Sequence, residues 1–118
     1  MSIKEITSDE LKNKMDRGEP FILLDLLGEK SYQSLHLPQA IWLSTEDYDE
    51  FIKQVKELAG DDLEQTIIVY GASFKDERST IKTAELLEAG FNNVLDFKGG
   101  LKDWAAELYP LEGLRAPK

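Results

Sequence analysis

The sequence predicts an α/β fold in which a mostly parallel sheet lies between helices. Short unbroken apolar runs, typical of strands buried on both faces, alternate along the chain with stretches whose apolar residues are three and four positions apart, as in helices. Turn signals are spread evenly, and no repeat, linker or low-complexity tract divides the 118 residues. We therefore expect a single domain over residues 1–118.

The first elements are a helix and a strand. Residues 7–10 read Thr-Ser-Asp-Glu, the spacing of a capping box, which predicts a helix from about Ser8 to Asp16 that Gly18 ends. Residues 21–24 read Phe-Ile-Leu-Leu and predict a buried strand, followed directly by Asp25.

The middle of the chain predicts a short helix, a strand and a long helix. Residues 29–35 suit the short helix, after which the His-Leu-Pro sequence of residues 36–38 breaks the pattern and residues 40–43 resume as a strand. From residue 48 onward one apolar stripe indicates a helix that Gly60 stops. We expect four aromatic side chains along the chain to be core, namely Trp42, Phe91, Phe97 and Trp104.

The remaining elements follow the same alternation. Residues 66–70 are β-branched and aromatic and predict a core strand. After it the sequence indicates, in order, a loop over residues 71–78, a helix ended by Gly90, a strand over residues 94–97, a tight turn at Gly99 and Gly100, and a closing helix with an apolar stripe from Leu101 to Leu108.

The composition excludes several classes of function. With 23 acidic and 14 basic side chains the net charge is −9, which disfavours nucleic acid and anionic membranes as partners. The absence of cysteine excludes disulfides, thiolate metal sites and any cysteine nucleophile. Scattered acids have no metal-ligand spacing, so we expect no metal and no cofactor. Without a leader-like start or a long apolar stretch, the expected location is cytoplasmic.

Charge is unevenly distributed along the chain. Residues 44–64 contain eight acids and two lysines, a local charge of −6. We interpret this stretch as the solvated face of the long helix and its loops.

The loop after the third apolar strand is the predicted place for a ligand. In parallel α/β folds ligands bind beyond the carboxyl ends of strands, and a helix N-terminus offers backbone N–H groups to an anion. Lys75 and Arg78 would favour an anion there, whereas Asp76 and Glu77 would oppose it, and the glycines and lysine of a P-loop are lacking. The candidate loop residues are Gly71, Ala72, Ser73, Phe74, Lys75, Asp76, Glu77, Arg78 and Ser79.

Several segments, in order, resemble the rhodanese-like domains. The family's motifs are similar to Leu24-Asp25-Leu26-Leu27, Glu29-Lys30-Ser31-Tyr32, His36-Leu37-Pro38-Gln39-Ala40-Ile41, Ile68-Val69-Tyr70-Gly71, Arg78-Ser79, Ala84-Glu85-Leu86-Leu87, Gly90-Phe91-Asn92-Asn93-Val94 and Lys98-Gly99-Gly100-Leu101-Lys102-Asp103-Trp104. The resemblance covers nearly the whole chain. It implies a three-layer sandwich with a central sheet of about five strands and helices on both faces.

The chain departs from the family where that family's chemistry resides. Active rhodaneses carry sulfane sulfur on a cysteine at the position that resembles Gly71, and an arginine at the position that resembles Leu27. The loop is about two residues longer than usual and contains Asp76 and Glu77. The resemblance therefore implies a scaffold without its nucleophile, and we expect that Gly71→Cys alone restores little activity.

Other side chains are weak substitutes for that nucleophile. Ser73 would need an adjacent base, and the single histidine, His36, matches a turn that is structural in the family. We interpret His36 as bonded to backbone and Asp25 as a carboxylate that braces a strand end. Both are expected to support the loop rather than to react.

We thus predict a catalytically silent binding or regulatory module with a residual anion-binding loop at residues 71–79. Its expected partner is a protein or a small oxyanion. The alternative is a sulfurtransferase-related enzyme that works with a non-cysteine group or with a partner's thiol. A receiver-like signalling domain fits the length and acidity, but Asp25 has no acidic neighbour and Tyr70-Gly71 offers no phosphate acceptor.

Overall fold

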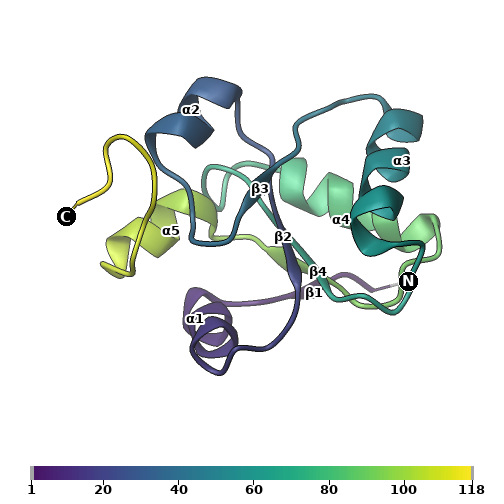
Figure 1. Cartoon of the computed structure of the whole chain (residues 1–118), viewed down its shortest axis with the longest axis horizontal. Coiled ribbons are helices and arrows are strands. Elements are labelled where there is room, and N and C mark those ends of the chain that lie inside the picture. The colour runs from purple at the N-terminus through teal and green to yellow at the C-terminus, as the bar shows by residue number, and fades with distance from the viewer. Residues whose placement is uncertain (1, 118) are drawn as a thin grey trace.

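The computed structural model of the chain describes residues 2–117 and contains a five-stranded sheet with helices on both faces (Figure 1). The strands are β1 (Lys4–Glu5), β2 (Ile22–Asp25), β3 (Ile41–Trp42), β4 (Ile67–Tyr70) and β5 (Val94–Phe97). They lie in the order β1-β5-β4-β2-β3, and every pairing is parallel. The predicted α/β class and strand count are confirmed.

The helices are α1 (Ser8–Asp16), α2 (Glu29–Ser34), α3 (Tyr48–Ala59), α4 (Arg78–Glu88) and α5 (Gly100–Ala106). The capping box that predicts α1 is present, with the Thr7 hydroxyl accepting from the Glu10 amide and the Glu10 carboxylate accepting from the Thr7 amide. Gly60 ends α3 in a left-handed conformation. Most element boundaries agree with the sequence prediction to within a few residues.

The two faces of the sheet have separate apolar cores. Leu24, Ile67 and Val69 point to one face, against α3 and α4, while Leu23, Ile68 and Tyr70 point to the other, against α1 and α5. Alternate side chains of a strand point to opposite faces, so strands covered on both sides have continuous apolar sequences. Figure 1 shows these helix pairs on opposite sides of the strands.

Two edge features differ from the sequence prediction. β1 has only two residues, both exposed and charged, so no apolar run predicts it; it pairs with β5 alone. Trp42 on β3 is not core: its side chain remains partly exposed at the sheet edge, and its indole N–H donates to the Leu27 carbonyl at 2.5 Å.

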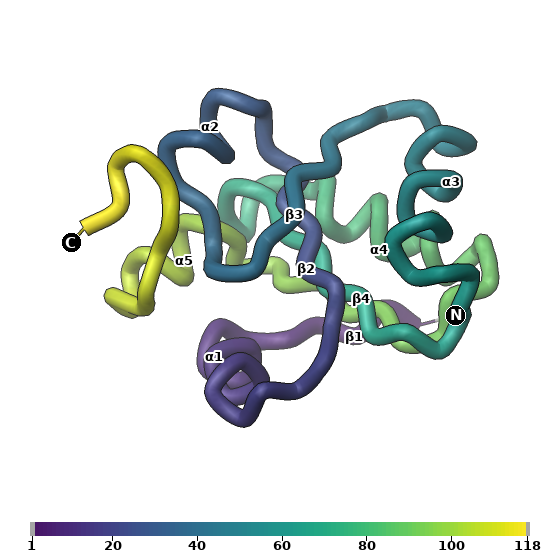
Figure 2. Tube along the Cα trace, viewed as in Figure 1, coloured from purple at the N-terminus to yellow at the C-terminus, as the bar shows by residue number. Residues whose placement is uncertain are grey.

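The last described residues return to α2. His36 and Glu112 form an antiparallel backbone bridge, and the indole N–H of Trp104 donates to the Pro110 carbonyl at 2.7 Å. Figure 2 shows this yellow segment beside α2. No helix within residues 2–117 is long and apolar enough to cross a membrane.

Candidate functional site

The candidate loop joins β4 to α4 at the carboxyl ends of the strands. On one side of it lies the end of β2, with Leu26 and Leu27, and on the other the turn before α5. The loop backbone is bonded to the first turn of α5, because the amides of Leu101 and Lys102 donate to the carbonyls of Gly71 and Ala72 at 3.0 and 2.9 Å. The loop therefore has a defined position at the mouth of the sheet.

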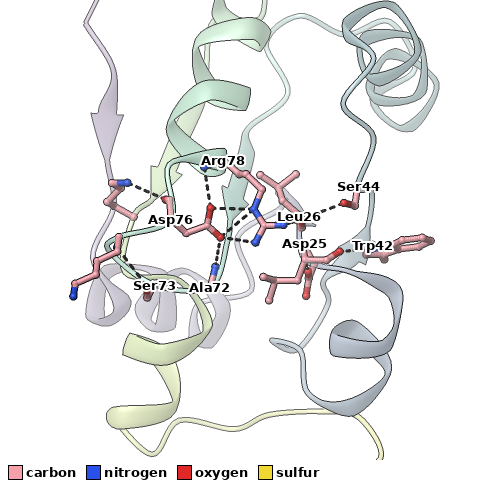
Figure 3. Close-up of polar contacts among 11 residues, drawn as sticks. Asp25, Leu26, Trp42, Ser44, Ala72, Ser73, Asp76 and Arg78 are labelled. Atoms are coloured by element: carbon pink, nitrogen blue, oxygen red, sulfur yellow. Dashed lines mark hydrogen bonds and ion pairs between the residues drawn. The ribbon is translucent and has the colours of Figure 1, made fainter.

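Asp76 occupies the centre of this loop (Figure 3). Its Oδ2 accepts from the Ala72 amide at 2.8 Å and its Oδ1 accepts from the Arg78 amide at 3.0 Å. The Arg78 guanidinium adds bonds from Nη2 at 2.7 Å and from Nε at 3.0 and 3.1 Å. The carboxylate thus binds the backbone N–H groups and the cation that the sequence suggests for an external anion.

The same carboxylate fills the space beside Gly71. A Cβ built on Gly71 would lie 2.8 Å from the carboxylate carbon of Asp76, closer than real Cβ contacts allow. The Asp76 carboxylate therefore occupies the space that a side chain on residue 71 would need. Bonds from Arg78 and from two amides lower the pKa of Asp76 well below its ordinary value, so the group is ionised near neutral pH.

Arg78 also connects the loop to the neighbouring strand end. Its Nη1 donates to the Leu26 carbonyl at 3.1 Å, and the Ser44 hydroxyl donates to that carbonyl at 3.2 Å. On the other side of the loop, Lys98 Nζ donates to the Asp76 carbonyl at 2.9 Å. Asp76 and Arg78 therefore fix both the loop and its distance from β2.

The remaining candidate residues have separate environments. Ser73 accepts from the Asp76 amide through its carbonyl and from the Lys75 amide through its hydroxyl. Glu77 is exposed and precedes α4 without a side-chain cap, while Ser79 is buried in the first turn of α4. Phe74 and Lys75 are exposed at the loop tip.

Asp25 and His36 have structural environments at the end of β2 and in the turn after α2. Asp25 is fully buried; it accepts from the Leu27 amide at 2.8 Å and from the Tyr70 hydroxyl at 2.5 Å. Burial raises the pKa of Asp25 above its ordinary value. His36 stacks on Tyr32, with ring centroids 4.0 Å apart, and its Nδ1 lies 2.6 Å from the Tyr32 carbonyl.

Within residues 2–117, Ser73 and His36 do not form a hydrogen bond with each other. In that part of the chain no three His, Asp or Glu side chains cluster as a metal site would require. The contact that sequence reasoning did not resolve is that of Asp76 with Gly71. A signal for it exists: an aspartate two residues before a helix often accepts from nearby amides.

The fold and the loop define a class of protein: parallel α/β domains in which a loop at the carboxyl end of a central strand leads into a helix. Residues 7–107 match the family model described as rhodanese-like domain. The chain belongs to the rhodanese-like domain family, as its sequence resemblance indicates.

Individual relatives agree with this assignment. A curated relative, described as a putative sulfur carrier protein YrkF of Bacillus subtilis, is 24% identical over 106 residues. That match covers 90% of this chain but 53% of the relative, so the chain spans about half of the relative's length.

Solved structures match over most of the chain. The Alr3790 protein from Anabaena sp. is 28% identical with a TM-score of 0.77, over 92% of this chain and 91% of that one. A thiosulfate sulfurtransferase from Pseudomonas aeruginosa is 27% identical with a TM-score of 0.81, over 94% of this chain and 20% of that one. The BH2092 protein from Bacillus halodurans, 23% identical with a TM-score of 0.82 over 96% of this chain and 79% of that one, shares the fold.

Proposed function

We propose that the chain is a catalytically silent rhodanese-like domain that acts as a binding or regulatory module through the loop at residues 71–79. The observation that carries the proposal is the filled space at residue 71. The chain has no cysteine, and Asp76 lies where a side chain on Gly71 would begin. Persulfide chemistry needs a thiolate, and here both the sulfur and the room for it are missing.

The electrostatics of the loop support the same conclusion. An oxyanion entering the loop competes with an ionised carboxylate that already holds Arg78 and the Ala72 amide. The residual anion site that we propose is therefore conditional: an external anion binds there only by displacing Asp76. Affinity for thiosulfate, sulfate or phosphate is accordingly expected to be weak in the native chain.

A second candidate is sulfur handling with a thiol supplied by another protein. The description of the Bacillus subtilis relative as a putative sulfur carrier favours it, since this chain spans only about half of that relative. In this candidate the chain positions a partner's thiol and donates no sulfur atom of its own.

Thiocyanate formation from thiosulfate and cyanide tests the proposal. We expect the purified chain, without added thiol, to give the same rate as buffer. A rate well above buffer would contradict catalytic silence. Repeating the assay with a small thiol tests the second candidate, which requires that the chain accelerate sulfur transfer to that thiol above its rate in buffer.

A further inference from the structure

The tip of the loop forms one wall of a surface groove. Phe74 has 60% of its surface exposed, and beside it a cavity of about 320 Å³ extends along α5. The cavity is lined by the loop residues Ser73, Phe74 and Lys75 and by Gly99, Lys102, Asp103 and Ala106. We call it the Phe74 groove. An exposed aromatic ring at the rim of a groove is a common anchor for a partner's apolar side chain.

The loop that carries Phe74 is held from several directions. The carbonyls of Gly71 and Ala72 accept from the start of α5, and the Asp76 amide donates to the Ser73 carbonyl at 2.9 Å. Asp76 and Lys98 bind the loop from within, as described above. A preorganised loop loses little conformational entropy when a partner binds, so Phe74 is suited to binding.

The charges around the groove are opposite in sign to the chain as a whole. Lys75 and Lys102 line it, and the ion pairs found across residues 2–117 include neither of them. The nearby acid Asp76 is paired with Arg78, which leaves Asp103 as the acid lining the groove. The net charge of the whole chain is −9. The groove is therefore a local cationic surface on an acidic protein.

We infer that the Phe74 groove binds an extended acidic segment of a partner protein that has an apolar side chain between its acids. The apolar side chain contacts Phe74 and Ala106, and the flanking carboxylates pair with Lys75 and Lys102. This inference rests on the proposed function, because it names the partner chemistry of the same loop.

A second apolar groove gives an internal comparison. It lies between β3 and α3, where Trp42 and Leu58 are partly exposed, and Glu50 and Glu57 line it beside Lys53. An acidic segment is repelled there. Charge thus distinguishes the two grooves for a single probe.

The test uses a synthetic peptide with a central Leu-Phe pair flanked on both sides by acidic residues. Amide chemical shifts of the full chain are followed at low salt as the peptide is added. We expect saturable shifts at residues 73–75 and 99–106, weakening as ionic strength rises. Phe74→Ser should lower the affinity about tenfold or more, and Lys75→Glu with Lys102→Glu should abolish saturable binding. Leu58→Ser, and Lys53→Glu with Lys56→Glu, make the same kinds of change on α3 at the second groove and should leave the affinity unchanged.

Any of these results would overturn the inference: no saturable shift, shifts confined to the second groove, or equal binding of a peptide with lysines in place of the acids. Shifts at the Phe74 groove that depend on chain concentration without peptide would instead identify a second copy as the occupant, and would also overturn it. The thiocyanate assay on the same preparation separates the two proposals. Failed peptide binding with a background rate rejects only the acidic partner, whereas thiocyanate turnover rejects the silent module.

Discussion

The Tyr70 hydroxyl donates a hydrogen bond to Oδ2 of Asp25 at 2.5 Å, between the ends of two neighbouring parallel strands. The same hydroxyl oxygen accepts from the Leu37 amide at 3.1 Å, and both side chains are fully buried. One phenol thus connects β4, the end of β2 and the turn that follows α2. Burial and the neighbouring carboxylate raise the pKa of Tyr70 far above its ordinary value, so it remains a donor.

Tyr70→Phe should destabilise the fold by about 1 to 3 kcal/mol, because it leaves a buried carboxylate oxygen and a buried amide without a partner. Urea unfolding of the variant measures the loss. Tyr48→Phe is the control, since Tyr48 lies at an exposed position at the start of α3 and should change stability little. Equal unfolding midpoints for native chain and Tyr70→Phe would show that the hydroxyl network contributes nothing.

Asp76→Ala should create an anion site in the loop. The variant releases the amides of Ala72 and Arg78 and the guanidinium, all of which the carboxylate now holds. We expect sulfate to bind about tenfold more tightly or better, detected by amide shifts at residues 71–79. Glu77→Ala removes the same charge from an exposed neighbour without changing the loop's bonds. Similar affinities in the two variants would mean that Asp76 does not block the loop.

Gly71→Cys should fold less stably than the native chain, by about 1 to 3 kcal/mol, because its side chain must displace Asp76. Its thiocyanate rate should stay near background. Adding Asp76→Ala should recover stability beyond the sum of the single effects, with a coupling of about 1 kcal/mol, and should raise the rate.

Gly28→Cys is the matched control for this cycle, since a Cβ on Gly28 meets no atom within 4 Å. It should cost little stability. Strong turnover from Gly71→Cys alone would show that Asp76 moves out of the way easily.

Acid should weaken the fold in part through Asp76. Because its folded pKa is lowered, its stabilising contribution is complete above its ordinary pKa of 3.8 and is lost as the pH falls below that value. The stability difference between native chain and Asp76→Asn should therefore be largest near neutral pH and shrink below about pH 4. Asp25 acts in the opposite direction, since its raised pKa favours the protonated folded form as the pH falls. Urea midpoints from about pH 3 to pH 7 test this, and a pH-independent difference would contradict it.

Gly100→Ala should be more destabilising than Gly60→Ala by at least about 1 kcal/mol. Both glycines have left-handed backbones, with φ of 65° and 63°. A Cβ on Gly60 meets open space, whereas on Gly100 it would lie 3.0 Å from the carbonyl carbons of Gly71 and Ala72. Thermal unfolding compares the two, and equal losses would show that the loop adjusts freely to the added methyl group.

Much of the fold is predictable because burial imposes patterns on the sequence. The stripe of α3 with Gly60, and the four-residue apolar run of β4, each satisfy local and tertiary requirements together. β1 is not predictable in this way, since Lys4 and Glu5 become a strand only through backbone bonds to β5. Trp42 misleads for a related reason: β3 is an edge strand, and its aromatic side chain has no second layer to cover it.

The sequence predicts where the candidate loop lies in the fold, but not which of its side chains fold into it. The position of the loop follows from the order of strands and helices, and the missing cysteine is visible in the sequence. Asp76 and Glu77 are both acidic and adjacent in the sequence, yet Asp76 folds into the loop and Glu77 faces solvent. That difference depends on where the loop backbone places each residue, which charge alone does not determine.

The contact of Asp76 with Gly71 also makes the cost of a substitution at residue 71 depend on the residue at position 76. While Asp76 stays folded in, any side chain at residue 71 collides with its carboxylate. A side chain at residue 71 therefore costs less stability after residue 76 has changed than before it. The order in which the two residues change thus affects the stability of the intermediate sequence, although the final pair is the same.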